Sequence, residues 1–134
     1  MKHEYDNRNF AAIADALHDQ AFSIDTMDFN RAQNVLHVPI YREPTWRRSA
    51  DVSVPVACFD VYNVSGIHVD DPEKLVVFTI NELHMRDGNT ITVETNEPMT
   101  FEIKLASSDI RACIEIFDER YFSWMAKPLE RKST

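Results

Sequence analysis

The chain has 134 residues, of which 44% are hydrophobic and 27% charged, a composition typical of one globular domain rather than a disordered or membrane-spanning chain. Its formal net charge of −8 at pH 7 opposes the binding of phosphate backbones, which argues against a general nucleic-acid-binding protein. No apolar run approaches the roughly 20 residues that a membrane-spanning helix needs, and the first ten residues lack the apolar stretch of a secretory signal. We therefore expect one domain over residues 1–134, in the cytoplasm, with neither a membrane nor a nucleic acid as its partner.

The N-terminal region predicts one short helix. Residues 6–9 offer several N-cap side chains, and Phe10, Ile13, Ala14 and Leu17 follow at the spacing of one helical stripe. We expect His18 at the C-terminal end of this helix, where the exposed carbonyl groups favour an imidazolium.

After residue 19 the apolar period changes from 3.6 to 2, which predicts a strand over 22–27 and a second strand over 35–41. In the second strand Leu36, Val38 and Ile40 should face the core, with Val35, His37 and Tyr41 on the other side. Pro39 has no N–H for a ladder, so we expect this strand to lie at a sheet edge or to carry a bulge.

Residues 54–71 predict two strands that join near Gly66, and a longer strand follows over 73–86. The apolar phase of the longer strand slips, which predicts a bulge near Asn81 and Glu82. The dipeptide Asp87-Gly88 predicts a tight turn directly after it.

Three more alternating segments, 90–95, 99–106 and 110–117, predict an antiparallel meander with one buried face and one solvated face. A short C-terminal helix should follow Asp118 and end at Pro128, and the tail should be loose from about residue 128. The expected fold is mainly β (α+β): an antiparallel β-sandwich or curled sheet with one N-terminal helix and a short C-terminal helix.

The two cysteines, Cys58 and Cys113, each lie within a strand-like segment and are expected to be buried, reduced thiols. The segment Leu17-His18-Asp19 has two interpretations. It is either a general base with its carboxylate or, as we favour, the place where the helix ends and the chain enters its first strand.

No cofactor is expected, because two glycines cannot build a glycine-rich phosphate loop. His68 and Asp70 share one side of a predicted strand and are weak candidates for metal ligands, although a solvated turn before Pro72 explains the aspartates equally well. No catalytic residue is assigned.

The loop after residue 40 contains the one basic and aromatic cluster of an acidic chain. We predict a binding surface there, with the alternative that the aromatic ring packs under the domain while the arginines pair with local acids. Its residues are Tyr41, Arg42, Trp46, Arg47 and Arg48.

A helix that ends in "LHD", a hairpin, the strand pair "CFDVYNVSGIHV" and the later strands "ITVET", "MTFEIKL" and "IRACIEIF" together resemble a loose group of small bacterial β-rich domains. Some members of this group are uncharacterised, and others are immunity proteins that neutralise a partner toxin. The resemblance covers roughly residues 16–117. It implies a compact β-sandwich or curled sheet that works by binding, and it transfers no catalytic residue.

Three functional hypotheses follow. The leading one is a non-enzymatic protein-binding module, either an immunity-like inhibitor of a basic toxin or an accessory protein, with a protein partner of basic character. The alternative is a small hydrolase that uses His68, Asp70, His84 or Cys113 brought together by folding. The third is a structural subunit that forms a homo-oligomer through the edge at Pro39 or through the C-terminal aromatic residues.

Overall fold

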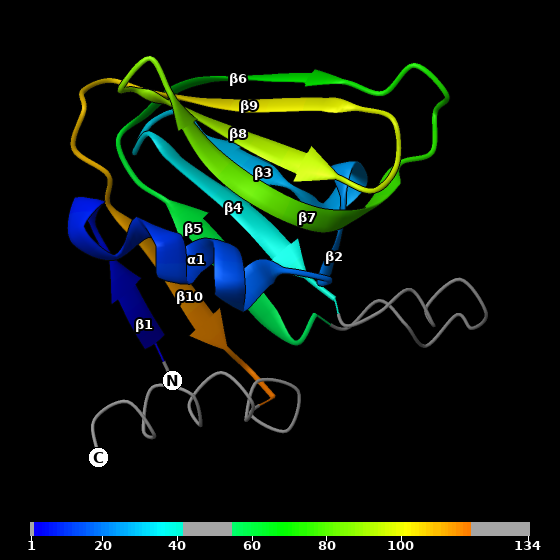
Figure 1. Ribbon diagram of the computed structural model, residues 1–134, viewed down its shortest axis with the longest axis horizontal. Helices are drawn as coiled ribbons and strands as arrows, with labels where there is room; N and C mark the ends of the chain where they lie inside the picture. Colours follow the sequence, from blue (N-terminus) through cyan, green and yellow to red (C-terminus); the bar gives the residue numbers. More distant parts are fainter. Residues whose placement is uncertain (1, 42–54, 119–134) are drawn as a thin grey trace.

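The structure is a computed structural model that describes residues 2–41 and 55–118 of the chain (Figure 1). Its described part has one α-helix, α1 (Phe10–Leu17), and two short 3₁₀ helices, η1 (Asn7–Asn9) and η2 (Ile24–Thr26). The described strands are β1 (Lys2–Tyr5), β2 (Ala21–Ser23), β3 (Asp28–Asn30), β4 (Val35–Ile40), β5 (Ala57–Val61), β6 (Val64–Asp70), β7 (Val77–Arg86), β8 (Thr90–Thr95), β9 (Thr100–Leu105) and β10 (Ala112–Ile116).

These strands form two five-stranded sheets in which all pairs are antiparallel. The first sheet has the order β1-β10-β5-β4-β3, and the second sheet has the order β2-β7-β8-β9-β6. A single bridge between Ala21 and Tyr41 joins β2 to the end of β4, so the two sheets meet at this corner. In Figure 1 β6, β9, β8 and β7 of the second sheet lie across the upper part of the molecule, and α1 lies below them, where it contacts β7 and β1.

One core fills the space between the two sheets. The inward side chains of both sheets are buried there, together with Ile13, Ala16 and Leu17 of α1. Phe22 is at its centre, with its ring centroid 5.7 Å from that of Phe78 and 5.5 Å from that of Phe101. The predicted β-rich α+β fold with an N-terminal helix is confirmed, because the amphipathic stripe of α1 and the alternating strands bury their apolar faces in one place.

Several local predictions are also confirmed. The register of β7 against β8 shifts between Ile80 and Glu82, which is the predicted bulge. Residues 87–89 connect these strands. Asp87 and Gly88 have φ angles of 57° and 75°, and the N–H of Asn89 donates to the carbonyl of Arg86, which is the predicted tight turn. Leu36, Val38 and Ile40 face the core as expected.

The predicted meander of the last three strands is wrong. β8 and β9 are neighbours in the second sheet, but β10 crosses to the first sheet and pairs there with β5 and β1. β6 occupies the place beside β9 instead. Alternation within each strand specifies which side is buried, whereas the choice of neighbour depends on contacts far apart in the sequence.

The prediction that the strand with Pro39 lies at a sheet edge is wrong for the strand as a whole, but it holds at Pro39 itself. β4 is not an outermost strand, since β3 and β5 flank it. β3 opposes only Val35–His37 of β4, however, so Pro39 lies beyond the end of β3 and its missing N–H costs no bond to that strand. The segment 24–26, predicted as strand, is the helix η2, because the Ser23 hydroxyl accepts a hydrogen bond from the N–H of Asp25 and turns the chain.

The predicted C-terminal helix and loose tail lie outside the described residues, as does most of the arginine-rich loop. Among the helices that the structure describes, none has the length and apolar character needed to cross a membrane.

Candidate functional site

One row of side chains crosses all five strands of the first sheet. Each member lies directly opposite the next on the neighbouring strand, and side chains in such register point to the same face of a sheet. The alternate residues Leu36, Phe59 and Ile114 are buried in the core, so this row lies on the outer face. The row consists of Glu4, Cys113, Asp60, His37 and Asp28.

Asp60 is at the centre of the contacts in this row. Its Oδ1 lies 2.6 Å from Nδ1 of His37 on β4 and 3.2 Å from Sγ of Cys58, two residues earlier on β5. A carboxylate oxygen accepts, so the imidazole N–H and the thiol both donate to it. The side chain of Asp60 is 14% exposed and that of His37 is 37% exposed. We refer to these three residues as the His37–Cys58–Asp60 cluster.

Both cysteines in this region are free thiols. Burial, the hydrogen bond to Asp60 and the charge of that carboxylate together raise the pKa of Cys58 to about 12. Burial also raises the pKa of Cys113, and the Asp60 charge adds to the effect. Cys58 donates to a carboxylate instead of to an imidazole, so this arrangement does not activate the thiol as a nucleophile.

The outer face of the second sheet has a different polar row, which runs His84, Thr92, Glu102 and His68 across β7, β8, β9 and β6. Beside it, Glu82 lies directly opposite Glu94. Nε2 of His84 lies 2.9 Å from Glu94 and 3.2 Å from Glu82, so one imidazole bridges the two carboxylates. The hydrogen bond to Glu94 is the main cause that raises the pKa of His84, and the charges of Glu94 and Glu82 add to it.

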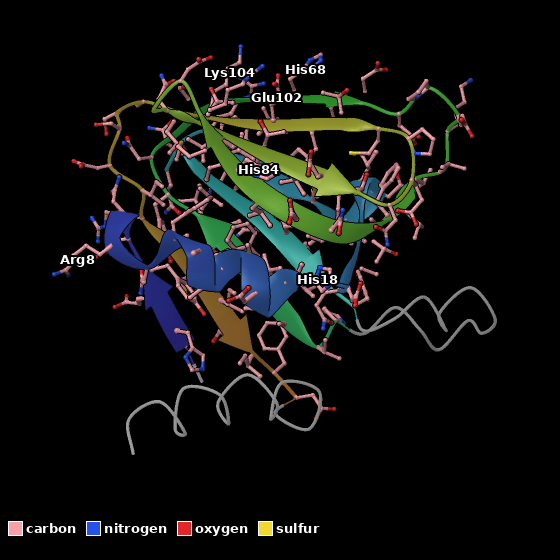
Figure 2. All side chains as sticks on the ribbon, in the orientation of Figure 1. Arg8, His18, His68, His84, Glu102 and Lys104 are labelled. Atoms are coloured by element: carbon pink, nitrogen blue, oxygen red, sulfur yellow. The ribbon has the colours of Figure 1, made fainter. Side chains whose placement is uncertain are left out.

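Ion pairs continue along this face. Arg86 of β7 makes a close contact with the carboxylate of Glu102 on β9. Figure 2 shows Lys104, Glu102 and His68 close together along the β6 and β9 side of the second sheet, with His84 further down on β7. The surface is polar and solvated, as the alternating pattern predicts for the outer side of an antiparallel sheet.

The sequence-based metal candidates do not form a group of three ligands. His68 and Asp70 are both exposed on β6, on the same side, as predicted. Two groups of three potential metal ligands occur among residues 2–41 and 55–118, namely the His37–Cys58–Asp60 cluster and the group Glu82, His84 and Glu94. Neither contains His68 or Asp70. Of the hydrolase candidates, His68 and His84 lie at opposite ends of one row on the second sheet, and Cys113 lies on the first sheet.

The segment Leu17-His18-Asp19 is a structural junction. Leu17 is fully buried, and the N–H of Asp19, at a φ of 66°, donates to the carbonyl of Ile80. Nδ1 of His18 lies 2.8 Å from the carbonyl oxygen of Asn81, at the bulge of β7. The ring therefore links the end of the helix to β7. This differs from the sequence-based prediction, in which His18 interacts with the carbonyl groups of its own helix.

The predicted binding surface after residue 40 is described only at its first residue. Tyr41 is 6% exposed and its backbone pairs with Ala21, so its ring belongs to the buried part of the domain. Arg42, Trp46, Arg47 and Arg48 lie outside the described residues, and the binding role of this loop stays a prediction.

Sequence reasoning missed the His37–Cys58–Asp60 cluster, although part of the signal was present. Cys58 and Asp60 are two residues apart in a predicted strand and must share a face, and His37 was placed on the outer side of the preceding strand. What was missing is the register that sets His37 opposite Asp60. Comparison of the chain with protein-family models, with curated proteins and with solved structures found no match.

Proposed function

We propose that this chain is a non-enzymatic binding protein whose partner is a basic protein. The observation that carries the proposal is the distribution of charge. The described residues contain 18 of the 22 Asp and Glu but only 7 of the 14 Lys and Arg, which gives this part of the chain a formal net charge of −11. A field of this sign attracts cationic surfaces and increases the rate of their association.

The outer face of the second sheet is the surface that we assign to the partner. It presents Glu82 and Glu94 side by side, and both side chains are at least half exposed. The nearby Arg86 is already paired with Glu102, so it opposes a cationic partner less than a free arginine would. A lysine or arginine from a partner can replace or supplement the imidazole that bridges the two glutamates.

The hydrolase alternative gains no comparable support. In the described part of the chain the surroundings raise the pKa of both thiols, and His37 is hydrogen-bonded to the same carboxylate as Cys58 instead of to the thiol. The two free cysteines favour a reducing compartment, so a cytoplasmic location belongs to the same proposal. The resemblance to immunity proteins supplies its narrowest form, in which the basic partner is a toxin.

The test begins with capture of partners from a lysate of the native host on the immobilised chain, elution by salt and identification by mass spectrometry. The partner is then purified, and its Kd is measured against three forms of the chain. We expect E82Q/E94Q to weaken binding by tenfold or more, mainly by slowing association, because two carboxylates leave the proposed surface.

The variant D25N/D109N is the matched control, because it removes the same amount of charge from exposed positions outside this face. It should bind almost as well as the unmodified chain. Equal losses in both double variants would mean that only total charge matters, and a partner that is not basic, or no partner at all, would refute the proposal.

A further inference from the structure

We propose that His37, Cys58 and Asp60 form a binding site for one divalent transition-metal ion, for which Zn²⁺ is the most suitable ion. The three side chains come from the adjacent strands β4 and β5 and lie on the outer face of the first sheet. This site is separate from the surface assigned to a protein partner, and it does not depend on that assignment.

The spacing of the donor atoms suits a metal ion. Nδ1 or Nε2 of His37, Sγ of Cys58 and a carboxylate oxygen of Asp60 all lie within 4.8 Å of one another. Bonds of about 2.0 to 2.3 Å in a tetrahedral zinc site place neighbouring donor atoms about 3.3 to 3.7 Å apart. Sγ of Cys58 is already 3.2 Å from Oδ1 of Asp60, and His37 needs to move only from 2.6 Å to about this range, which a small rotation of its side chain provides.

The donor set indicates which ions would bind. Imidazole nitrogen, thiolate sulfur and carboxylate oxygen together favour Zn²⁺ and its close analogue Co²⁺ over Mg²⁺ and Ca²⁺, which prefer oxygen alone. On binding, the ion takes the place of the two hydrogen atoms through which His37 and Cys58 now donate hydrogen bonds to Asp60. The thiol proton passes to solvent as the metal–sulfur bond forms, and the imidazole carries its remaining proton on Nε2 when Nδ1 is the ligand.

The residues next to the cluster supply a negative environment. Asp28 lies opposite His37 on β3, and Glu115 lies opposite Cys58 on β10. Lys2 faces Glu115 from the far side, on β1, and is the one cation among these neighbours in the two rows. A divalent cation would offset the carboxylates, and neighbouring carboxylates commonly orient a histidine ligand through its second nitrogen.

The site is also accessible and has room for a further ligand. The side chain of His37 is 37% exposed, while that of Asp60 is mostly buried, so an ion can enter past the imidazole and be held against the strand. Three protein ligands leave one tetrahedral position, which water would fill.

The group Glu82, His84 and Glu94 is the natural comparison. Its three side chains are about half exposed and it has no sulfur, and the bridging imidazole already explains why two glutamates can face each other. We therefore assign the ion to the His37–Cys58–Asp60 cluster and use the other group as the control.

The experiment is a titration of the full chain, stripped with a chelator and kept reduced, with Co²⁺. A thiolate ligand gives a charge-transfer absorption band that oxygen and nitrogen ligands do not give. We expect one equivalent of Co²⁺ to produce this band and one equivalent of Zn²⁺ to remove it. C58S should abolish the band, and H37Q should weaken affinity by about 100-fold or more, because the loss of even an outer-shell partner costs about 10- to 100-fold.

The control variant H84A should bind Co²⁺ with unchanged affinity and an unchanged band. Far-ultraviolet circular dichroism would establish that each variant is folded, and H37Q or D60N would replace C58S if that variant did not fold. A chain that shows no saturable thiolate band, a band that persists in C58S, or a band that is lost in H84A would overturn the assignment.

Discussion

The thiol of Cys58 donates a hydrogen bond to Oδ1 of Asp60, two residues further along β5, over 3.2 Å. Both side chains point to the outer face of the first sheet because they are separated by one strand period. Asp60 lies within reach of both Cys58 and His37 and accepts a hydrogen bond from each, so its side chain links two strands.

This contact predicts that the thiol of Cys58 reacts slowly with alkylating reagents. Burial and the Asp60 carboxylate raise the pKa of Cys58 to about 12, so thiolate should be scarce at pH 8. In metal-free protein with C113S as background, we expect alkylation of Cys58 by iodoacetamide to be more than about tenfold slower than in the urea-unfolded chain. D60N removes the nearby charge and should speed the reaction several-fold. Equal rates in the folded and unfolded chains would contradict this prediction.

The bridge between His84 and two glutamates predicts a raised histidine pKa. An NMR titration should give His84 a value above the ordinary 6.5, and E94Q should lower it more than E82Q, since the hydrogen bond to Glu94 is the largest cause. The charged form is favoured in the folded chain. The stability from this bridge is therefore present below the unfolded-state pKa and is lost as the pH rises through the folded-state value.

Urea unfolding at several pH values provides the check on stability. The difference between the unmodified chain and H84N should be largest in acid solution, near pH 5.5, and should shrink above the folded-state pKa of His84. A difference that grows with pH would mean that the imidazole does not act as a cation here.

Much of the local structure could be predicted because it depends on neighbouring residues. The apolar stripe of α1, the phase slip at Asn81 and Glu82 and the turn at Asp87-Gly88 each follow from a few adjacent side chains. The strand β1 was not predicted. This four-residue segment is mostly polar and shows no alternation of polar and apolar residues, and it becomes a strand by pairing with β10.

The site was harder to predict than the fold. The sequence places each member of the His37–Cys58–Asp60 cluster on an outer face. It does not predict that β4 and β5 pair, or that His37 lies opposite Asp60. These strands are separated along the chain by residues 41–56, and a one-residue change of register would move every side chain to the opposite face. His68 and Asp70 were singled out since they are close in sequence, which is a weaker guide than cross-strand register.

Phe22 should be among the residues most important for stability. It is fully buried and its ring lies against Phe78 and Phe101, so F22A would open a cavity where the sheets meet. We expect a loss of about 3 to 5 kcal/mol in the free energy of unfolding, measured with urea. F117A is the matched control, because Phe117 is 54% exposed and its loss should change stability by less than about 0.5 kcal/mol. Similar losses in the two variants would contradict the assigned core.

The loop between β6 and β7 depends on one carboxylate. Asp71 accepts hydrogen bonds from the N–H groups of Leu75 and Val76, at 3.0 and 2.8 Å. These bonds hold Val76 at a φ of 69°, a conformation that costs a β-branched residue about 1 to 2 kcal/mol. The carbonyl of Val76 in turn accepts from the N–H of Ile24, which ties the loop to η2.

D71A removes both acceptors while the strained backbone remains. We expect the free energy of unfolding to fall by about 1 to 3 kcal/mol, as for other hydrogen bonds to a charged group, and hydrogen exchange at Leu75 and Val76 to become faster. D70A changes the neighbouring exposed aspartate and should leave both measurements within about 0.5 kcal/mol of the unmodified chain. If D70A and D71A had the same effect, local charge would be responsible, and Asp71 would have no special part in holding Val76.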